Sequence, residues 1–373
     1  MKVLVTGGTG LLGNTILRQL SDQGHELIAL VRGQVDDKVF DGIKTEFVQG
    51  DLSDLPASPR DAAPPRDQSA PSDQSAPRDQ SAVSDQSAVG DQSASSDKSS
   101  PVIQAIANCD AVIHSAAMIH IGWHKRDASM RVNRDGTRAI AQACLKHDRK
   151  LVLVGTVNTL AVATKTTTAT EDTSLDNAGG QVECSYVTSK RASVNEVKQA
   201  VGQGLRASIV HPGFMLGPWD WKPSSGRMMV ELAKNWTPIA PSGGCSVCDS
   251  RDVAAGAIAA IEKGANDGRE YILAGHNVTY RQLWDEISDR MNVKAPVMSA
   301  GPLQKWIAAT VGDLWAAVSK KETDINSAGV KMSSQYHWYD CTRAEQELGY
   351  NIRPMNETLD DGAEWIREHH LEG

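Results

Sequence analysis

Short apolar runs alternate with longer amphipathic segments along much of the chain, beginning at its first residues. Between the runs, apolar residues recur with the period of a helix, as in Asn14–Gln23, Arg131–His147 and Tyr186–Val201. Parallel strands joined by crossover helices produce this order of elements. The pattern therefore predicts an α/β fold built on a doubly wound parallel sheet. Its expected strands are Lys2–Thr6, Glu26–Val31, Thr45–Gln49, Ala111–His114, Leu151–Val154 and Ala207–Val210.

A low-complexity stretch interrupts this alternation after the third expected strand. From residue 65 to residue 100 the chain repeats hexapeptides such as PRDQSA, dominated by Asp, Gln, Ser, Ala and Pro and without an aromatic residue. Such a segment buries too little apolar surface to offset the entropy lost on ordering. A hexapeptide β-helix would need a recurring inward aliphatic residue, and only Val83 and Val89 occupy the first position of a repeat. We therefore predict that residues 56–101 are a disordered insertion in a surface loop.

The first expected strand runs directly into a glycine-rich loop, Thr6–Gly13. Glycines at positions 7, 10 and 13 allow a sharp turn and a close approach of the backbone to a pyrophosphate, and the following helix presents free N–H groups. The spacing alone is weak evidence, but a preceding strand and a following helix are the context that the motif requires. We interpret the loop as a dinucleotide-binding turn; a glycine-rich turn without a ligand is the alternative.

The regular pattern ends near Pro212, beyond which the chain is irregular and rich in Trp, Pro and Gly. We predict a Rossmann-type dinucleotide domain formed by residues 1–55 and 102–213. Residues 214–373 are expected to form mainly a smaller substrate lobe, with residues 250–275 returning to the Rossmann core.

One apolar stretch, Trp306–Val318, stands out in this second part. Gly312 and Asp313 interrupt it, and it is too short to span a bilayer. We interpret it as a helix packed on the protein or covering a substrate cleft. An interfacial membrane helix is the alternative, but such a helix is usually rich in Lys or Arg on its polar face, and this one is not.

Charge and cysteine content exclude several classes of protein. The formal net charge of −8 provides no footprint for nucleic acid. The six cysteines are scattered, and Lys2 precedes only three apolar residues, so we expect no secretory signal and favour a reduced, cytoplasmic protein. Cys245 and Cys248 have the spacing of zinc ligands, but no second pair accompanies them, and we expect no metal site.

Tyr186 and Lys190 place a phenol and an ammonium four residues apart, on one face of an expected helix. A free phenol has a pKa of about 10, and a neighbouring cation lowers that pKa toward the range of a useful general acid. Thr156 adds a hydroxyl just past the fifth expected strand, at the edge where open α/β sheets bind ligands. These three are the candidate catalytic residues; a solvated helix face is the alternative for the pair.

These motifs and their order resemble those of the extended short-chain dehydrogenase/reductase (NAD-dependent epimerase/dehydratase) superfamily, over the whole chain except the repeat insertion. The loop Thr6–Gly13 is similar to its TGxxGxxG, and Val132–Thr137 to its VNxxGT helix start. Thr156, Tyr186 and Lys190 match its catalytic hydroxyl, tyrosine and lysine. With Arg32, the cofactor-binding residues are expected to be Thr6, Gly7, Gly10, Leu11, Leu12, Gly13, Asp51, Leu52, Ser115, Ala116, Ala117, Asn133, Tyr186, Lys190, Pro212 and Gly213.

Two stretches narrow the resemblance to dihydroflavonol-4-reductase-like proteins and hopanoid-associated sugar epimerases: Pro212–Arg227 and Cys341–Tyr350. The chain departs from the family at Gly155-Thr156, where two serines are usual. The substrate-sorting asparagine of plant flavonol reductases is not found near Thr159–Val162, which argues against a flavonoid substrate. The candidate substrate contacts are His120, Trp123, Asn158, Phe214, Trp219 and Arg227.

The choice of nicotinamide cofactor depends on the end of the second expected strand. An acidic residue there would bind the ribose diol of NAD and repel a 2′-phosphate. The strand instead ends in Val31-Arg32-Gly33, with no carboxylate before Asp36, and Arg32 could pair with a 2′-phosphate. We predict NADP(H) in preference to NAD(H); an ordinary surface arginine is the alternative.

Three functions remain open. The first is an NADP-dependent reductase or dehydrogenase of a ketone or secondary alcohol, with Tyr186 as general acid and base. The second is a nucleotide-sugar epimerase or dehydratase with bound NAD, although Val157-Asn158 replaces the Asp-Glu usual in dehydratases. The third is a non-catalytic dinucleotide sensor or scaffold, against which the complete Thr–Tyr–Lys set argues. A small-molecule substrate, and a homodimer through the helices after the fourth and fifth strands, are implied by the resemblance.

Overall fold

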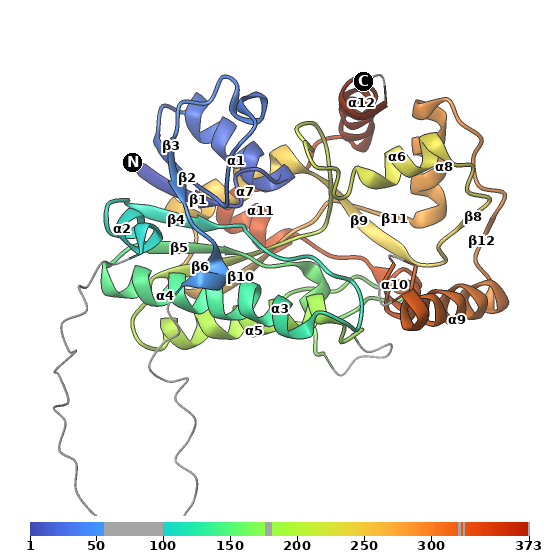
Figure 1. Ribbon diagram of the computed structural model, residues 1–373, viewed down its shortest axis with the longest axis horizontal. Helices are drawn as coiled ribbons and strands as arrows, with labels where there is room; N and C mark the ends of the chain where they lie inside the picture. Colours follow the sequence, from blue (N-terminus) through green and yellow to red (C-terminus); the bar gives the residue numbers. More distant parts are fainter. Residues whose placement is uncertain (56–99, 176–180, 320–321, 324, 372–373) are drawn as a thin grey trace, which may run out of the picture.

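The computed structural model describes residues 1–55, 100–175, 181–319, 322–323 and 325–371. Within these residues a layered α/β core lies beside a smaller lobe, and the chain passes between them several times (Figure 1). The insertion predicted to be disordered, residues 56–101, lies outside the described residues apart from its last two positions.

The core is a seven-stranded parallel sheet with the order β10-β6-β5-β4-β1-β2-β3. The strand order reverses between β1 and β4, where such sheets open a ligand crevice at their carboxyl ends. The predicted doubly wound parallel sheet is therefore confirmed, with β10 as an additional edge strand. The strands are β1 (Lys2–Thr6), β2 (Glu26–Val31), β3 (Glu46–Gln49), β4 (Ala111–His114), β5 (Lys150–Val154), β6 (Ala207–Pro212) and β10 (Asp267–Leu273).

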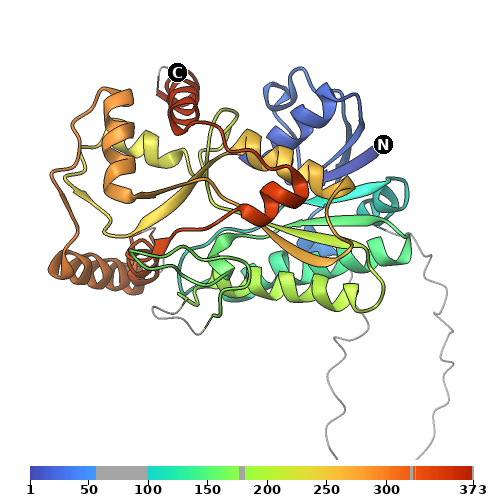
Figure 2. The ribbon, with the colours of Figure 1, turned by 180° about the vertical axis from the view of Figure 1, so that it is seen from behind.

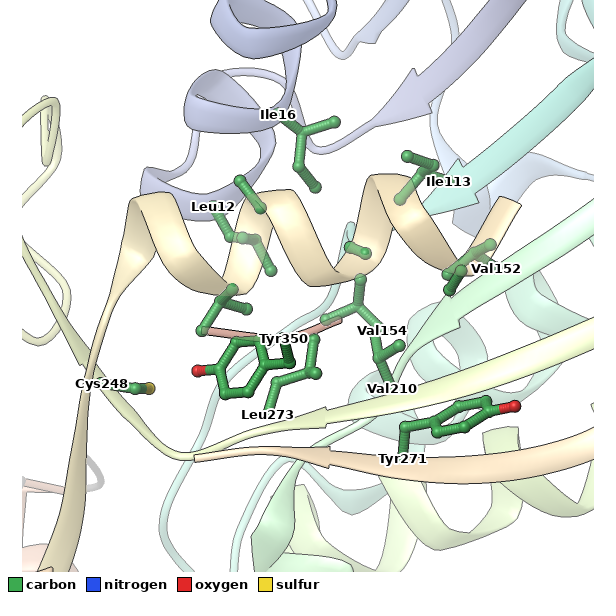
Figure 3. Packing of buried hydrophobic residues seen from close by; sticks show 14 of the residues in the cluster. Leu12, Ile16, Ile113, Val152, Val154, Val210, Cys248, Tyr271, Leu273 and Tyr350 are labelled. Carbon is green, nitrogen blue, oxygen red and sulfur yellow. The ribbon is translucent and has the colours of Figure 1, made fainter. Parts of the chain in front are cut away.

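Helices cover both faces of this sheet (Figure 2). They are α1 (Leu11–Asp22), α2 (Pro101–Ala107), α4 (Gly136–Lys146), α5 (Ser185–Val201) and α7 (Ser250–Glu262). On one face, Leu12 and Ile16 of α1 pack with Val152 and Leu273 of the sheet and with α7 (Figure 3). On the other face, α2, α4 and α5 bury a second apolar cluster. Strands buried on both faces read as continuous apolar runs, which is why the pattern located them.

The smaller lobe forms from residues after β6, whereas α7 and β10 return to the core. Its main sheet has the order β11-β9-β13, and β7 also pairs with β9. Its strands are β7 (Phe214–Leu216), β8 (Ile239–Ala240), β9 (Gly244–Asp249), β11 (His276–Thr279), β12 (Met298–Ser299) and β13 (Tyr336–His337). Its helices are α6 (Arg227–Lys234), α8 (Tyr280–Met291), α9 (Pro302–Ser319), α10 (Ser327–Met332) and α12 (Met355–Ile366); α11 (Thr342–Leu348) packs on the core.

Two helices begin earlier than the pattern predicts. α1 starts at Leu11, directly after the glycine loop, rather than at Asn14. The helix expected to begin at Arg131 consists of α3 (Arg126–Ser129), a π-helical turn (Met130–Asp135) and α4 in succession. π-helical turns are frequent at functional sites, and this one carries Asn133.

α9 leaves most of its apolar side chains exposed. Only Gly312 and Ala316 of this helix are buried, whereas Leu314 and Trp315 are 63% and 60% exposed. A Cβ on Gly312 would lie 1.9 Å from the carbonyl oxygen of Ile325, so close packing on the segment before α10 requires glycine there. Over the residues that the structure covers, no helix is both long enough and apolar enough to cross a membrane.

Candidate active site

The three candidate catalytic side chains meet at the carboxyl end of β5 and the first turns of α5. Thr156 precedes a 3-10 turn, Val157–Thr159, and its hydroxyl accepts the N–H of Asn158 at 3.3 Å. Tyr186 is the second residue of α5, and Lys190 follows one turn later. All three are buried, and the side chain of Thr156 lies close enough to the phenol of Tyr186 to lower its pKa.

Burial dominates the titration of both α5 residues. It raises the pKa of Tyr186 above the ordinary value, and the side chain of Thr156 opposes this rise. Burial lowers the pKa of Lys190 to about 8. The Nζ of Lys190 donates to the carbonyl oxygen of Val154 at 2.6 Å. The expected lowering of the tyrosine pKa by Lys190 is therefore not found here, because removal from water has the larger effect.

The main chain of residues 120–122 fixes the start of α5. The N–H of Tyr186 donates to the carbonyl of His120 at 3.2 Å, and the N–H of Ser185 donates to that of Gly122 at 2.9 Å. Glu322 contacts the same segment. Its carboxylate lies 2.8 Å from Nε2 of His120 and accepts the N–H of Trp123 at 2.8 Å. Of the predicted substrate residues, His120 thus lies next to the tyrosine, and Trp123 follows Gly122 in the same segment. Nothing in the sequence around Glu322 indicated this contact.

His114 connects the glycine loop to the turn after β4. The Thr6 hydroxyl accepts the N–H of Ala116 at 3.0 Å and donates to His114 Nδ1 at 2.7 Å. His114 Nε2 donates to the Thr137 hydroxyl at 3.0 Å. Burial, with the charge of Lys190, lowers the pKa of His114 to about 3, so the ring is neutral, as this pattern of donors requires. His114 was not among the predicted residues, since its only signal in the sequence is a polar residue closing an apolar strand.

Asn133 ties the same turn to the catalytic helix. Its side-chain amide donates to the carbonyl of Met118 and to the hydroxyl of Ser189, each at 2.9 Å. Its oxygen accepts the N–H of Met118 at 2.7 Å. Asn133, predicted as a cofactor residue, therefore orders the loop that contains the predicted residues Ser115, Ala116 and Ala117.

The glycine loop has the shape that a pyrophosphate site requires. Gly7 has a φ of +77°, and a Cβ on Gly13 would lie 2.2 Å from the carbonyl oxygen of Gly7. Within the described residues no side chain caps α1 at Gly10, and its first turn has no acidic residue. Free amides and the positive end of the helix dipole therefore face the loop. These residues fit the phosphates of a dinucleotide.

The expected adenosine end of the site lies at the ends of β2 and β3. Arg32 is exposed directly after β2. Asp36 is engaged locally, since its carboxylate accepts the N–H of Lys38 at 3.0 Å. Hydrogen bonds from Ser53, with a smaller contribution from the charge of Arg32, lower the pKa of Asp51.

The remaining predicted residues lie at several places. Pro212 ends β6, and a Cβ on Gly213 would lie 2.5 Å from the carbonyl oxygen of Ser246, so this segment packs closely on β9.

Asn158 lies next to Thr156, whereas the guanidinium of Arg18 in α1 lies over the ring of Trp219, 5.2 Å from the ring centroid. Leu11 and Leu12 begin α1, Leu52 is buried beside Gly136, Phe214 begins β7 and Arg227 begins α6.

No group of His, Cys, Asp and Glu side chains within the described ranges could hold a metal ion. All six cysteines are buried and carry no disulfide, and burial raises the pKa of Cys245 and Cys248 well above that of a free thiol. The zinc-like spacing of this pair therefore corresponds to two packed thiols in β9.

The comparison with known families identifies the family of the chain. A family model described as "NAD dependent epimerase/dehydratase family" matches residues 3–60 and 79–274. The chain belongs to this family. The membership confirms the resemblance drawn from the motifs, and the family is one of enzymes that use a nicotinamide dinucleotide.

Relatives extend over nearly the whole chain. A protein named "Putative dihydroflavonol 4-reductase" from Synechocystis is 27% identical, covering 98% of this chain and 94% of its own. Sterol demethylase protein B from Methylococcus capsulatus is 24% identical, with 99% of each chain covered. A solved nucleoside-diphosphate-sugar epimerase from Pseudomonas aeruginosa has a TM-score of 0.71 at 21% identity, covering 99% of this chain and 98% of its own. The last similarity shows the fold alone.

Proposed function

We propose that this protein is an NADP(H)-dependent reductase or dehydrogenase that interconverts a ketone and a secondary alcohol. The supporting observation is the meeting of Thr156, Tyr186 and Lys190 at the carboxyl edge of the sheet, the edge that also carries the glycine loop. The full-length similarity to a protein named as a reductase favours the same reaction.

The cofactor would be held by residues along this edge, from the ends of β2 and β3 to the start of α5. The backbone of Gly7, Gly10 and Gly13 would take its pyrophosphate, Asp51 and Arg32 its adenosine, and Lys190 its nicotinamide ribose. A bound nicotinamide supplies or accepts the hydride; the remaining chemistry is proton transfer by side chains of the chain.

Tyr186 provides the proton in the direction of reduction. Because burial raises its pKa, the phenol is protonated at neutral pH and can donate to an oxygen that becomes an alkoxide. The side chain of Thr156 lies close to the same phenol, so both groups can bind one substrate oxygen. The charged form of Lys190 would stabilise the phenolate that remains.

The end of β2 favours NADP(H). Arg32 follows the strand, and the next carboxylate along the chain, that of Asp36, accepts the main-chain N–H of Lys38. A thermal-shift titration tests this choice: NADP(H) should raise the melting temperature more than NAD(H), and Arg32→Glu should remove the difference. Lys44→Glu, a charge reversal at an exposed position before the opposite end of β3, should preserve it. A larger shift with NAD(H) in the unmodified protein would refute the NADP assignment.

A carbonyl panel followed at the nicotinamide absorbance tests the reaction. We would include a long-chain 3-oxo ester, a 3-oxosteroid and a dihydroflavonol, since relatives carry sterol and dihydroflavonol names. Oxidation of NADPH that depends on one of these carbonyls is the expected result. If no carbonyl is consumed, the reductase proposal fails.

A nucleotide-sugar epimerase with tightly bound NAD is the second candidate, favoured by the family description. One arginine that could serve a sugar diphosphate, Arg251, is already paired with Asp249 at 2.8 Å and with Asp361 at 2.6 Å. The two candidates differ in the purified protein: NAD that survives purification supports the epimerase, whereas a protein that must be supplied with NADPH supports the reductase.

Three further expectations are retained as proposals. We infer a small-molecule substrate and a homodimer through α4 and α5 from the family resemblance, and a cytoplasmic location from the buried cysteines, which carry no disulfide. Light scattering after size exclusion measures the oligomeric state; a monomer at micromolar concentration would contradict the dimer.

A further inference from the structure

A fully buried histidine lies directly behind the main chain of Thr156. His211 is in β6, and its side chain is 0% exposed. Its Nδ1 lies 3.2 Å from the amide nitrogen of Thr156 and 3.1 Å from the carbonyl oxygen of the same residue. A single ring nitrogen therefore contacts both polar main-chain groups of the residue that carries the candidate hydroxyl.

The other ring nitrogen of His211 is held by a carboxylate. Its Nε2 lies 2.7 Å from Glu270 in β10, and the second oxygen of Glu270 accepts from Lys198 of α5 at 2.5 Å. Although burial raises the pKa of Glu270, its hydrogen bonds to His211 and Lys198 and their charges bring it to about 2. Glu270 is therefore ionised and can only accept, which places a hydrogen on His211 Nε2.

This arrangement determines what His211 Nδ1 can do. In the neutral ring Nδ1 has a free lone pair and accepts the N–H of Thr156; in the charged ring it donates to the carbonyl of Thr156. Nδ1 is close enough for either bond, since it lies 3.2 Å from the amide nitrogen and 3.1 Å from the carbonyl oxygen of Thr156. In either charge state His211 holds the main chain of Thr156.

Gly155 provides the space for the ring. A Cβ on Gly155 would lie 2.6 Å from Nδ1 and 2.8 Å from Cε1 of His211. The chain has glycine at this position where the family usually has serine. A side chain at 155 would displace the ring of His211, so the position of the ring depends on this glycine.

We propose that His211, oriented by Glu270, is a positioning residue for Thr156. It fixes the peptide groups on both sides of the Thr156 Cα and so directs the hydroxyl toward the phenol of Tyr186 and a substrate oxygen. This inference rests on the proposed function, in which that hydroxyl binds the reacting carbonyl. His211 itself contacts the main chain of Thr156 and not the reacting atoms.

A double-mutant cycle tests the proposal, with ethyl 3-oxodecanoate and NADPH as the probe. His211→Leu should lower kcat about tenfold or more, with the Kd for NADPH unchanged within about twofold. His211→Asn should recover part of the loss, because its amide oxygen can accept the N–H that Nδ1 accepts. Ser208→Ala, another buried polar position of the same strand, should leave kcat unchanged.

The decisive measurement is His211→Leu in a Thr156→Val background. If His211 acts through the hydroxyl of Thr156, the second substitution should lower kcat by less than about twofold. Full multiplication of the two losses would show a merely structural role and overturn the inference. Should His211→Leu fail to fold, Glu270→Gln replaces it in the same cycle, with a smaller loss that should likewise vanish when Thr156 is Val.

Hydrogen exchange separates failure of this inference from failure of the proposed function. If the probe is not reduced, or if Thr156→Val and Tyr186→Phe leave turnover intact, the reductase proposal fails. Exchange at the Thr156 amide still decides the inference: His211→Leu should accelerate it about tenfold or more relative to Ser208→Ala. Unchanged exchange would overturn the assignment of His211.

Discussion

Burial of ionisable side chains determines the chemistry of the site at the scale of single residues. His114, Tyr186 and Lys190 are all buried, and in each the pKa moves toward the uncharged form. Water is replaced here by specific partners: a hydroxyl for Tyr186, a main-chain carbonyl for Lys190, and two threonine hydroxyls for His114. Such concentrated pKa shifts are typical of functional sites.

Replacement of the tyrosine tests its role as proton donor. Tyr186→Phe removes the proton donor and keeps the ring, so turnover should fall by about two to four orders of magnitude. The Kd for NADPH should remain within about twofold. Tyr336→Phe is the control, because its hydroxyl donates to the carbonyl of Ser242 in the smaller lobe. Steady-state assays and a fluorescence titration measure both quantities, and near-normal turnover of Tyr186→Phe would remove the tyrosine from the mechanism.

The lowered pKa of Lys190 predicts how stability depends on pH. Its pKa is about 8 in the folded protein, against an ordinary value of 10.5 that applies to the unfolded chain. Below about pH 8 both states bind the proton and the cost of burial is present in full. Between pH 8 and 10.5 the unfolded state alone holds the proton, so stability rises with pH.

Urea unfolding of the unmodified protein and of Lys190→Met measures this effect. The difference in free energy of unfolding between them should shift by about 2 kcal/mol in favour of the unmodified protein from about pH 7 to pH 10. Comparison with the variant cancels the other groups that titrate in this range. A difference that does not change with pH would show that Lys190 titrates normally.

At the scale of elements, close contact between backbones holds the glycine loop against the turn after β4. A Cβ on Gly7 would lie 2.9 Å from the backbone of Ala116, and one on Gly13 would lie 2.2 Å from Gly7. The hydroxyl of Thr6 and the ring of His114 join the same two segments. The strand–loop–helix is therefore built by its neighbours as well as by its own sequence.

Substitution in the loop tests this packing. Gly13→Ala should weaken NADPH binding at least about tenfold and lower the free energy of unfolding by about 1–3 kcal/mol, because the loop must move away from the new methyl group. Gly10→Ala is the matched control for the free energy of unfolding, since its Cβ would lie at an ordinary 3.4 Å from the nearest atom of the protein. Calorimetry measures NADPH binding and urea unfolding measures stability. Equal losses in the free energy of unfolding from both substitutions would refute the steric explanation.

At the scale of the whole molecule, part of the repeat insertion has no counterpart in the family model. The family model matches residues 3–60 and 79–274 and leaves residues 61–78 out. Deletion of residues 61–78 should therefore change the melting temperature by less than about 2 °C and leave turnover unchanged. Differential scanning fluorimetry and the carbonyl assay measure both, and loss of either would assign the repeats a role in the folded protein.

The sequence by itself determined the sheet and the position of the glycine loop, and it singled out Thr156, Tyr186 and Lys190 as candidate catalytic residues. Local physics explains this: strands covered on both faces need apolar runs, and a loop in which a Cβ would clash needs glycine. Helix starts were less accurate, as the beginning of α1 shows, because residues beside a glycine loop have little periodic pattern of their own.

The tertiary structure alone decided which distant side chains complete the site. The contacts of Glu322 and the pairing of His211 with Glu270 gave no signal in the sequence, because the partners are far apart along the chain. The only signal of His114 was a polar residue closing an apolar strand. The tertiary structure also reversed the expected pKa direction of Tyr186: spacing placed a cation nearby, but the balance between burial and charge depends on packing around both groups. The hydrophobic periodicity of a segment indicates which of its faces is buried, and it does not indicate which residues of other segments bury that face.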